Sequence, residues 1–240
     1  MIEKGEKVMN TATFEELLGS EHTDDFIESA RPFTKLMMQY RCAMLEIQTK
    51  FEVLNTELSL DEDRNPIQSV CCRLKQPVSI IEKLKRKGQV VCVENIEKYI
   101  HDVAGIRVIC AFPEDIYLLA DKICAQDDIR LIEKKDYIRF PKQNGYRSLH
   151  LILEVPVFFA DEKKKMQVEV QFRTIAMDFW ASIEHKVRYK KEGNPFTPQI
   201  EEALKSCAEG IHKIDLKMQQ ISKQANFQTL KNDFMEKTGV

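Results

Sequence analysis

The sequence lacks a strong excess of either charge, because 36 Lys and Arg residues stand against 38 Asp and Glu residues and leave a formal net charge of −2. Such a balance gives no global reason to bind nucleic acid, so any anion site must come from local clustering of basic residues. No apolar run approaches the length of a membrane span, and residues 1–10 are too polar for a signal peptide. We therefore expect a cytoplasmic protein with no membrane partner and no requirement for nucleic acid.

Patterns typical of metal sites are also scarce. The seven cysteines are odd in number and contain no CxxC pair, and several lie in apolar contexts such as VVCV and VICAF. They are typical of buried thiols in a reducing cytosol, and we expect no zinc site. The dipeptide His101-Asp102 resembles the metal-binding pair of phosphohydrolases, but the remaining histidines are not placed to complete such a site.

The length of 240 residues and a hydrophobic content of 43% suit one large domain with helical additions. Residues 33–58 and 200–221 repeat apolar side chains every three or four positions, which predicts two long amphipathic helices, the first with Pro32 in its first turn. Two such helices are more than one small sheet needs for cover, so we expect self-association through them. The predicted layout is a loose arm over 1–23, a central α+β unit with its N-terminal helix over 24–190, a helical extension for oligomerisation over 191–225 and a loose tail over 226–240.

In the segment QVEVQFRT (167–174) apolar and polar residues alternate strictly, which predicts a half-buried strand. The centre of the polar face carries Glu169 between two amides and an arginine. A carboxylate on a rigid strand suits a metal ion or proton transfer, and the alternative is a solvated strand face. Thr174 then suits the N-cap of a helix. The apolar seam expected on that helix consists of Ala176, Phe179, Trp180, Ile183 and Val187.

Residues 73–87 are the local exception in charge, with six basic residues and one acidic residue. Arg73 and Lys75 precede an expected helix that Gly88 caps, and the other basic side chains recur along it. Such a cluster can hold a polyphosphate, and the alternative is a solvated cationic face.

Two later segments place polar groups at the ends of strands. HDVAGIRVICAF (101–112) predicts a buried central strand with Asp102 at its mouth, and its one internal charge, Arg107, must either pair with an acid or face a site. In FPKQNGYRSLH (140–150), Tyr146 follows a glycine and precedes Arg147 and His150 at the start of another strand. An aromatic plane beside cationic donors suits a nucleobase with phosphates, and the alternative is a tyrosine packed in a hairpin.

Three segments in order, HDVAGIRVICAF, KDYIRFPKQNGYRSLH and VEVQFRTIAMDFWASIEHKVRYK, resemble the synthetase domain of the Rel/SpoT family, in particular the short, single-domain small alarmone synthetases of bacteria. The similarity runs from roughly residue 66 to residue 190 and implies a nucleotidyltransferase-like fold, a mixed β-sheet with helices on its faces. It implies a GTP pyrophosphokinase without hydrolase activity, which transfers the β,γ-pyrophosphate of ATP to the 3′-hydroxyl of GTP or GDP. The products are pppGpp or ppGpp, made in the stringent response, and AMP. The resemblance also implies Mg²⁺ as cofactor and a homotetramer.

The resemblance further implies a role for each matching residue. Asp102 and Glu169 match the two acidic positions of the family, Asp102 as a Mg²⁺ ligand and Glu169 as a metal ligand or as the base that takes the proton from the attacking hydroxyl. The implied ATP contacts are Arg73, Lys75, Ser79, Lys83, Arg86 and Arg107, with the two flat guanidinium groups of Arg73 and Arg107 around the adenine. The implied GTP contacts are Lys135, Lys142, Tyr146, His150, Gln171 and Asp178, with Tyr146 stacked on guanine.

Asp178 is ambiguous, because a carboxylate can accept two hydrogen bonds from guanine but can equally serve the dipole of its own helix. Two other functions stay open. A template-independent RNA nucleotidyltransferase shares the implied fold, although no extended basic stripe is present. A catalytically silent nucleotide sensor is the second alternative, although both acidic residues are retained.

Overall fold

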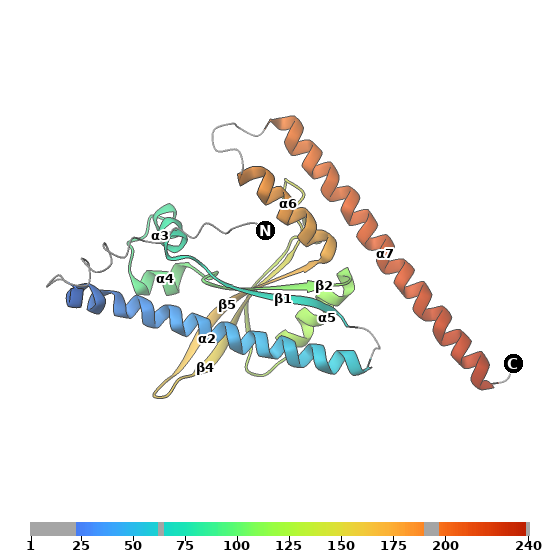
Figure 1. Ribbon diagram of the computed structural model, residues 1–240, viewed down its shortest axis with the longest axis horizontal. Coiled ribbons are helices and arrows are strands. Elements are labelled where there is room, and N and C mark those ends of the chain that lie inside the picture. The colour runs from blue at the N-terminus through green and yellow to red at the C-terminus, as the bar shows by residue number, and fades with distance from the viewer. Residues whose placement is uncertain (1–22, 62–64, 190–196, 239–240) are drawn as a thin grey trace, which may run out of the picture.

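The computed structural model describes residues 23–61, 65–189 and 197–238, so the loose arm expected over residues 1–23 lies outside it except for Thr23, which begins α2. Among these residues five strands form one sheet in the order β1-β2-β5-β4-β3 (Figure 1). The elements in chain order are α2 (Thr23–Asp61), β1 (Ile67–Leu74), α3 (Pro77–Arg86), α4 (Val93–Tyr99), β2 (Ala104–Cys110), α5 (Pro113–Cys124), β3 (Arg130–Asp136), β4 (Leu149–Phe158), β5 (Lys163–Thr174), α6 (Ile175–Tyr189) and α7 (Pro198–Thr238).

The sheet is mixed, which confirms the expected α+β class. β2 and β5 pair in parallel, whereas the other three neighbouring pairs are antiparallel. The alternation over 167–174 is confirmed, since Val168, Val170 and Phe172 are all fully buried on one face of β5. Strand β1 was not predicted from the sequence, because the basic residues at its C-terminal end suggested a charged segment. In the structure Val70, Cys72 and Leu74 of this strand pack against the core. Arg73 therefore lies on a strand and not in a loop before a helix.

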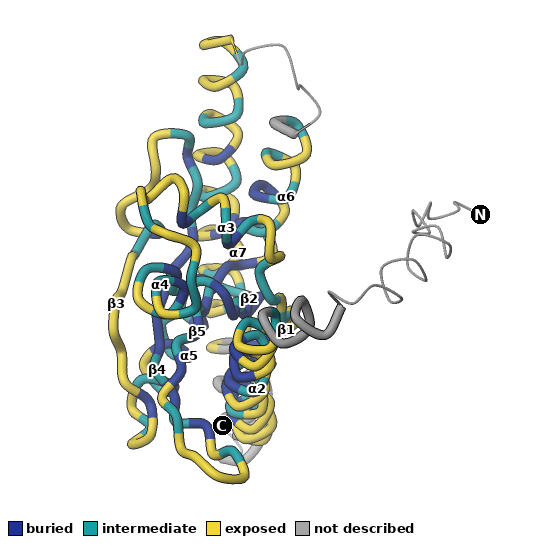
Figure 2. Tube along the Cα trace, turned by 90° about the vertical axis from the view of Figure 1, so that its left-hand side faces the viewer, coloured by how far each residue is buried: buried dark blue, intermediate teal, exposed yellow. Residues whose placement is uncertain are grey.

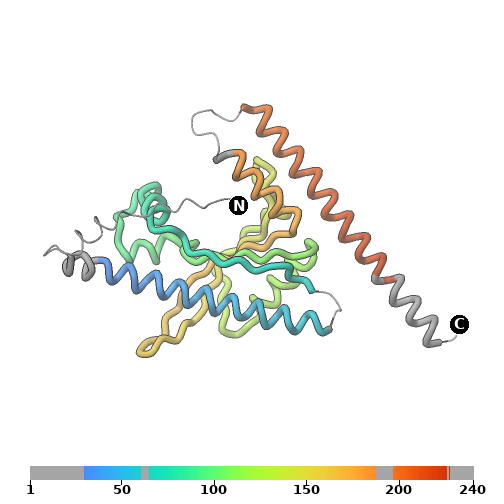
Figure 3. The backbone as a smooth tube through the Cα atoms, viewed as in Figure 1, coloured from blue at the N-terminus to red at the C-terminus, as the bar shows by residue number. Residues whose placement is uncertain are grey.

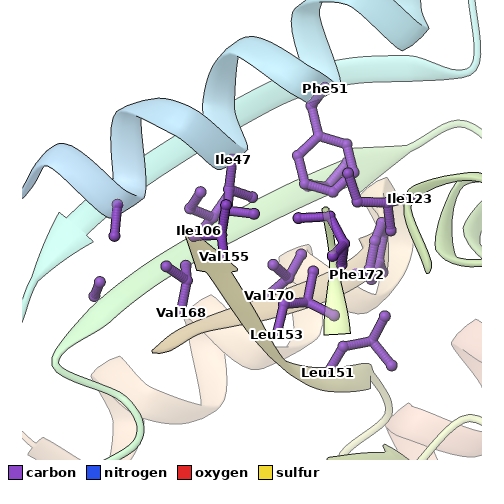
Figure 4. Close-up of a cluster of buried hydrophobic side chains, with 14 of the residues drawn as sticks. Ile47, Phe51, Ile106, Ile123, Leu151, Leu153, Val155, Val168, Val170 and Phe172 are labelled. Carbon is purple, nitrogen blue, oxygen red and sulfur yellow. The ribbon is translucent and has the colours of Figure 1, made fainter. Parts of the chain in front are cut away.

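Helix α2 covers one face of the sheet (Figure 1). Seven of its apolar side chains between Leu36 and Leu58, spaced three or four residues apart, are buried, as the periodicity predicts. The ring of Phe51 meets Phe172 of β5 edge-on, with centroids 5.6 Å apart (Figure 4). Pro32 lies inside α2, not in its first turn. It removes one backbone hydrogen bond, and the long buried face that follows offsets this loss.

The opposite face of the sheet is more open. Figure 2 shows the edge strand β3 exposed along nearly all its length, while the side of α2 toward the sheet is buried. On β5 the residues that alternate with the core, from Gln167 to Gln171, are only half-buried. This open face is where the polar side chains of the strands gather.

Helices α6 and α7 lie side by side, away from α2 (Figure 3). The expected seam of α6 is partly wrong: Trp180 is buried, but Phe179 and Ile183 are 61% and 41% exposed. The buried stripe is shifted because α6 packs against α7 through Trp180, whose Nε1 donates to the carbonyl of Leu204 at 2.9 Å. α7 continues through residues 226–238, where a loose tail was expected; residues 211–238 contain no glycine or proline to end it.

The cysteines differ in part from the expectation of buried thiols. All seven are free, but Cys110 alone is buried, and Cys71 and Cys207 are exposed. Within the ranges that the structure describes, no helix is both long enough and apolar enough to cross a bilayer.

A buried carboxyl group ties α7 to the end of β5. Thr174 accepts a hydrogen bond from the backbone N–H of Met177 at 3.1 Å, which confirms it as the N-cap of α6. Its own hydroxyl donates to Asp215 of α7 at 2.6 Å. Burial raises the pKa of Asp215 above its ordinary value, and the hydrogen bond from Thr174 offsets only part of this rise.

We expect Asp215→Asn to raise the thermal midpoint of unfolding near neutral pH. The raised pKa means that the folded state prefers the neutral carboxyl more than the unfolded chain does, so ionisation at neutral pH destabilises the fold. An amide accepts the same hydrogen bond without that charge. Thermal unfolding should show the gain shrinking as the pH falls toward about 4, where wild-type Asp215 is itself protonated. A lower midpoint for the variant at neutral pH would contradict this account.

Candidate active site

Strand pairing aligns polar side chains from all five strands in rows across the open face. One row joins Cys71, Arg107, Gln171, His150 and Lys135, each opposite the next on the adjacent strand. The neighbouring row joins Arg73, Gly105 and Glu169. Because position 105 carries no side chain, this second row is open between the guanidinium of Arg73 and the carboxylate of Glu169.

A cavity of about 530 Å³ opens over these rows, a size that suits a small-molecule ligand. It brings together residues from distant parts of the chain that the sequence predicted as one site. Its lining consists of Cys71, Cys72, Arg73, Lys75, Ser79, Asp102, Gly105, Ile106, Arg107, Glu169 and Gln171. The two acidic residues therefore face one cavity, and basic residues of the predicted ATP set lie beside them.

Asp102 stands at the N-terminal mouth of β2, held by two ammonium groups. Its Oδ2 accepts hydrogen bonds from Lys83 at 2.8 Å and from Lys75 at 3.1 Å. Burial raises the pKa of Asp102, but these two lysines outweigh burial and hold it below its ordinary value, so the side chain is an anion. Its other oxygen, Oδ1, is buried and has no hydrogen-bond partner. A buried carboxylate oxygen without a partner is costly unless a ligand completes it.

Glu169 is held on both of its oxygens. His150 Nδ1 lies 3.1 Å from Oε1, and the amide of Gln171 donates to Oε2 at 2.8 Å. Burial raises the pKa of Glu169, and the contacts with His150 and Gln171 outweigh it and lower the pKa overall. The charge of Asp102 acts in the raising direction, as expected for carboxylates that share one site.

A hydrogen-bond chain leads from a buried arginine to Glu169. Arg173, which is 6% exposed, donates to Tyr146 Oη at 2.8 Å, and Oη lies 2.9 Å from His150 Nε2. Because Arg173 supplies one hydrogen to Oη, the tyrosine hydroxyl is free to donate to Nε2. This assigns the proton of a neutral imidazole to Nδ1, which then donates to Glu169. Arg173 was seen in the sequence only as part of the polar strand face, and its burial has no sequence signal.

Asp178 is the acid with which Arg107 pairs. Its Oδ1 lies 3.2 Å from Arg107 and accepts a hydrogen bond from Arg173 at 2.8 Å. The two open alternatives for Arg107 thus both hold, because it pairs with an acid and also lines the cavity. Asp178 joins the cavity side of the site to the Tyr146 side.

Lys142 lies over the aromatic ring of Tyr146, 4.8 Å from its centroid, and 4.7 Å from that of Tyr137. Both contacts are short enough for cation–π attraction. Lys135 is half exposed and pairs with Glu133 at 2.9 Å. That contact, the largest of several, raises the pKa of Lys135. Arg86 is exposed in the last turn of α3 and does not line the cavity, so the structure does not bring it to the other ATP residues.

The residues present fit a divalent cation for which the protein supplies only one or two ligands. Among the described residues no group of three or more His, Cys, Asp or Glu side chains could hold a metal ion. Magnesium does not need such a cage, because it is usually bound by one or two carboxylates together with substrate phosphates and water. Asp102 carries a carboxylate oxygen, the buried Oδ1, that has no hydrogen-bond partner, and this residue lines the same cavity as Glu169.

Comparison with known proteins identifies the family of this chain. Residues 72–194 match the family described as "Region found in RelA / SpoT proteins". The chain is 40% identical over 205 residues to the GTP pyrophosphokinase YwaC of Bacillus subtilis, covering 85% of this chain and 97% of that one. It is 34% identical over 191 residues to the GTP pyrophosphokinase YjbM of the same organism, covering 80% and 89%.

Solved structures give the same result. The small alarmone synthetase 2 of Bacillus subtilis superposes with a TM-score of 0.72 at 42% identity, covering 80% of this chain and 98% of that one. The small alarmone synthetase 1 of the same organism, bound to its product pppGpp, also gives a TM-score of 0.72, at 33% identity, covering 80% and 97%. Because the family match over residues 72–194 covers half of the chain and includes both acidic residues, and these relatives are covered almost end to end, the chain belongs to the RelA/SpoT family, as one of its short, small alarmone synthetase members.

Proposed function

We propose that this protein is a GTP pyrophosphokinase, which transfers the β,γ-pyrophosphate of ATP to the 3′-hydroxyl of GTP or GDP and releases AMP. The observation that carries the proposal is the meeting of Asp102 and Glu169 in one cavity bordered by Arg73, Lys75 and Arg107. Family membership supports the same reaction. It also supports the products pppGpp and ppGpp, since a related synthetase is solved with pppGpp bound.

The donor nucleotide fits the cavity side of the site. Arg73 and Arg107 lie on adjacent strands, and their flat guanidinium groups suit the two faces of an adenine ring. Lys75 and Lys83 contact Asp102 at the cavity mouth, and Ser79 lines the wall, which supports all three as contacts for ATP phosphates. Arg86 is the least supported of the ATP set, because it reaches a phosphate only if its exposed side chain turns toward the cavity.

The acceptor nucleotide fits the side of Tyr146. The tyrosine ring suits stacking on guanine, but Lys142 lies over that ring. We propose that the base displaces the ammonium group, which then binds an acceptor phosphate, with Lys135 nearby. Oδ1 of Asp178 already contacts both Arg107 and Arg173. We therefore propose that the other oxygen, Oδ2, selects guanine.

Magnesium is the proposed cofactor, held by Asp102 and by the phosphates of the substrates. When bound, it would neutralise phosphate charge that otherwise repels the incoming hydroxyl. Asp102 has a free oxygen for this purpose, whereas both oxygens of Glu169 are already engaged. This difference favours Glu169 as the base, with Gln171 and His150 holding its carboxylate toward the acceptor. Its low pKa keeps it ionised and able to accept the proton of the 3′-hydroxyl.

The remaining assignments are part of the same proposal. Residues 24–190 form the synthetase domain with its N-terminal helix, and residues 191–225 form an extension for assembly, most simply a homotetramer. The exposed apolar side chains Ile214, Met218 and Ile221 on α7 support this assembly. The free thiols at every cysteine suit the reducing cytoplasm, where both nucleotides are available.

Incubation of the purified protein with ATP, GTP or GDP, and Mg²⁺, followed by separation of the nucleotides, tests the proposal. We expect AMP and a guanosine 3′-pyrophosphate in equal amounts, and no product when Mg²⁺ is chelated. Nucleotide addition to RNA with no transfer to GTP would favour the template-independent RNA nucleotidyltransferase. Tight binding of both nucleotides without turnover would instead identify a nucleotide sensor.

A further inference from the structure

The turn that carries Tyr146 rests on α7, a helix that begins at Pro198, beyond the family match over residues 72–194. The contact joins two small residues, Gly145 of the turn and Ala208 of α7. A Cβ atom at Gly145 would lie 2.6 Å from the Cβ of Ala208 and 3.4 Å from the backbone of Lys205. The turn and the helix are therefore in contact at a point where the turn has no room for an added methyl group.

The turn has little freedom to move away from that contact. Gly145 has a φ of +89°, a conformation that side-chain-bearing residues rarely adopt. Its N–H donates to the carbonyl of Lys142 at 2.8 Å, and the N–H of Lys142 donates to the carbonyl of Tyr146 at 3.2 Å. Asn144 further braces the turn, accepting from the Tyr146 N–H at 3.2 Å and donating to Glu184 of α6 at 3.3 Å. The turn thus moves as a unit, and both Lys142 and Tyr146 move with it.

The same contact belongs to a small apolar cluster, separate from the main core. Trp180, Ala181 and Ala208 are its buried members, and Tyr146, Leu204 and Ile211 pack against them. The aromatic ring proposed for guanine stacking is thus seated partly on α6 and α7. Its position depends on where α7 lies, and α7 is fixed here by the Trp180–Leu204 hydrogen bond and by Asp215.

We propose that Ala208 is a positioning residue for the acceptor nucleotide. By packing on Gly145 it sets the place of the turn from Lys142 to Tyr146, and hence of the stacking ring and of the phosphate-binding ammonium group. The donor side is independent of this contact, because none of the α7 side chains that the structure describes lines the cavity shared by Asp102 and Glu169. The inference rests on the proposed function. It gives α7, which lies outside the residues that match the family, a role in binding the acceptor nucleotide.

Enlarging residue 208 in the full chain tests the proposal. Ala208→Ser adds one atom at the contact and Ala208→Val adds two, so we expect the Kd for GTP or GDP to rise in that order. A displaced turn should weaken acceptor binding by about tenfold for valine, while the Kd for a non-hydrolysable ATP analogue stays within about twofold of wild type. Ala203→Val is the matched control, because Ala203 is exposed on the same helix and the substitution has the same helix-propensity cost.

The acceptor Kd can be read without turnover, because Trp180 is the only tryptophan of the chain and belongs to the cluster beside the turn. We expect GTP or GDP to change its fluorescence and the ATP analogue to leave it nearly unchanged. A protein that makes no pyrophosphate product, yet shows the graded loss of GTP affinity, would refute the proposed reaction and support this inference. Unchanged acceptor affinity in both the serine and the valine variants, with thermal unfolding confirming that the serine variant is folded, would overturn the role of Ala208.

Discussion

Neutralising either acidic residue is expected to lower the rate of pyrophosphate transfer about 100-fold or more while leaving the fold intact. Glu169→Gln removes the group proposed to accept the 3′-hydroxyl proton, and loss of such a base lowers kcat by about 100-fold or more. Asp102→Asn removes the negative charge that Lys75 and Lys83 now share. We expect it to shift the Mg²⁺ dependence of the residual activity to higher concentration, an effect that Glu169→Gln should not share. Steady-state rates across a Mg²⁺ series separate the two roles.

Glu154→Gln is the control for this pair. Glu154 is a hydrogen-bonded carboxylate of β4, but it pairs with Arg130 and does not line the cavity. Its neutralisation should leave kcat and the Mg²⁺ dependence at wild-type values. Wild-type turnover by either Asp102→Asn or Glu169→Gln, with an unchanged thermal midpoint, would remove the basis of the proposed reaction.

Replacing Tyr146 should separate binding of the acceptor from the proton path. Tyr146→Ala removes the stacking ring, and loss of one base–aromatic stack costs about 1–3 kcal/mol, so the acceptor KM should rise far more than the ATP KM. Tyr146→Phe keeps the ring but breaks the chain from Arg173 to His150. We expect it to keep the acceptor KM near wild type and to lower kcat, since His150 then loses the partner that fixes its tautomer.

Initial rates measured with each nucleotide varied in turn give both constants for each variant. Phe158→Ala is a suitable control, because Phe158 is an exposed aromatic at the far end of β4. Equal increases of the ATP and acceptor KM in Tyr146→Ala would contradict the stacking role. A kcat for Tyr146→Phe equal to that of wild type would show that the hydroxyl does not contribute to the chain.

Local patterns made much of the fold predictable. The alternation in β5 and the spacing in α2 follow directly from the periods of strand and helix, and burial confirms both. The spacing over residues 200–221 correctly predicted the helix α7, but Cys207, Ile214, Met218 and Ile221 of its apolar stripe are exposed. Strand β1 was missed because its charged end dominated its composition. The exposure of Phe179 and Ile183 was missed because α6 has two neighbours, the sheet and α7, and the second cannot be read from a single-helix pattern.

Part of the site could likewise be predicted from local motifs, and part could not. Asp102, Glu169 and the basic residues could be proposed from motifs, and the structure brings both acids to one cavity together with Arg73, Lys75 and Arg107. The connection from Arg173 through Tyr146 to His150 could not, because it joins two strands and a loop through tertiary contacts. Ala208 carries no chemical signal at all. Its importance arises only where a glycine of a distant turn lies against it.

The parallel pairing of β2 with β5 has a consequence for biosynthesis. The ribosome synthesises Lys75, Lys83, Asp102 and strand β2 in the first half of the chain. Strands β1 and β2 can associate as soon as both have been synthesised. Glu169 is added only after α5, β3 and β4, and it meets Asp102 through the long-range closure of the sheet, the kind of contact that forms slowly. On the proposed roles, a chain still on the ribosome short of β5 lacks Glu169, the group that would take the proton of the acceptor. We therefore expect no alarmone synthesis by an unfinished molecule.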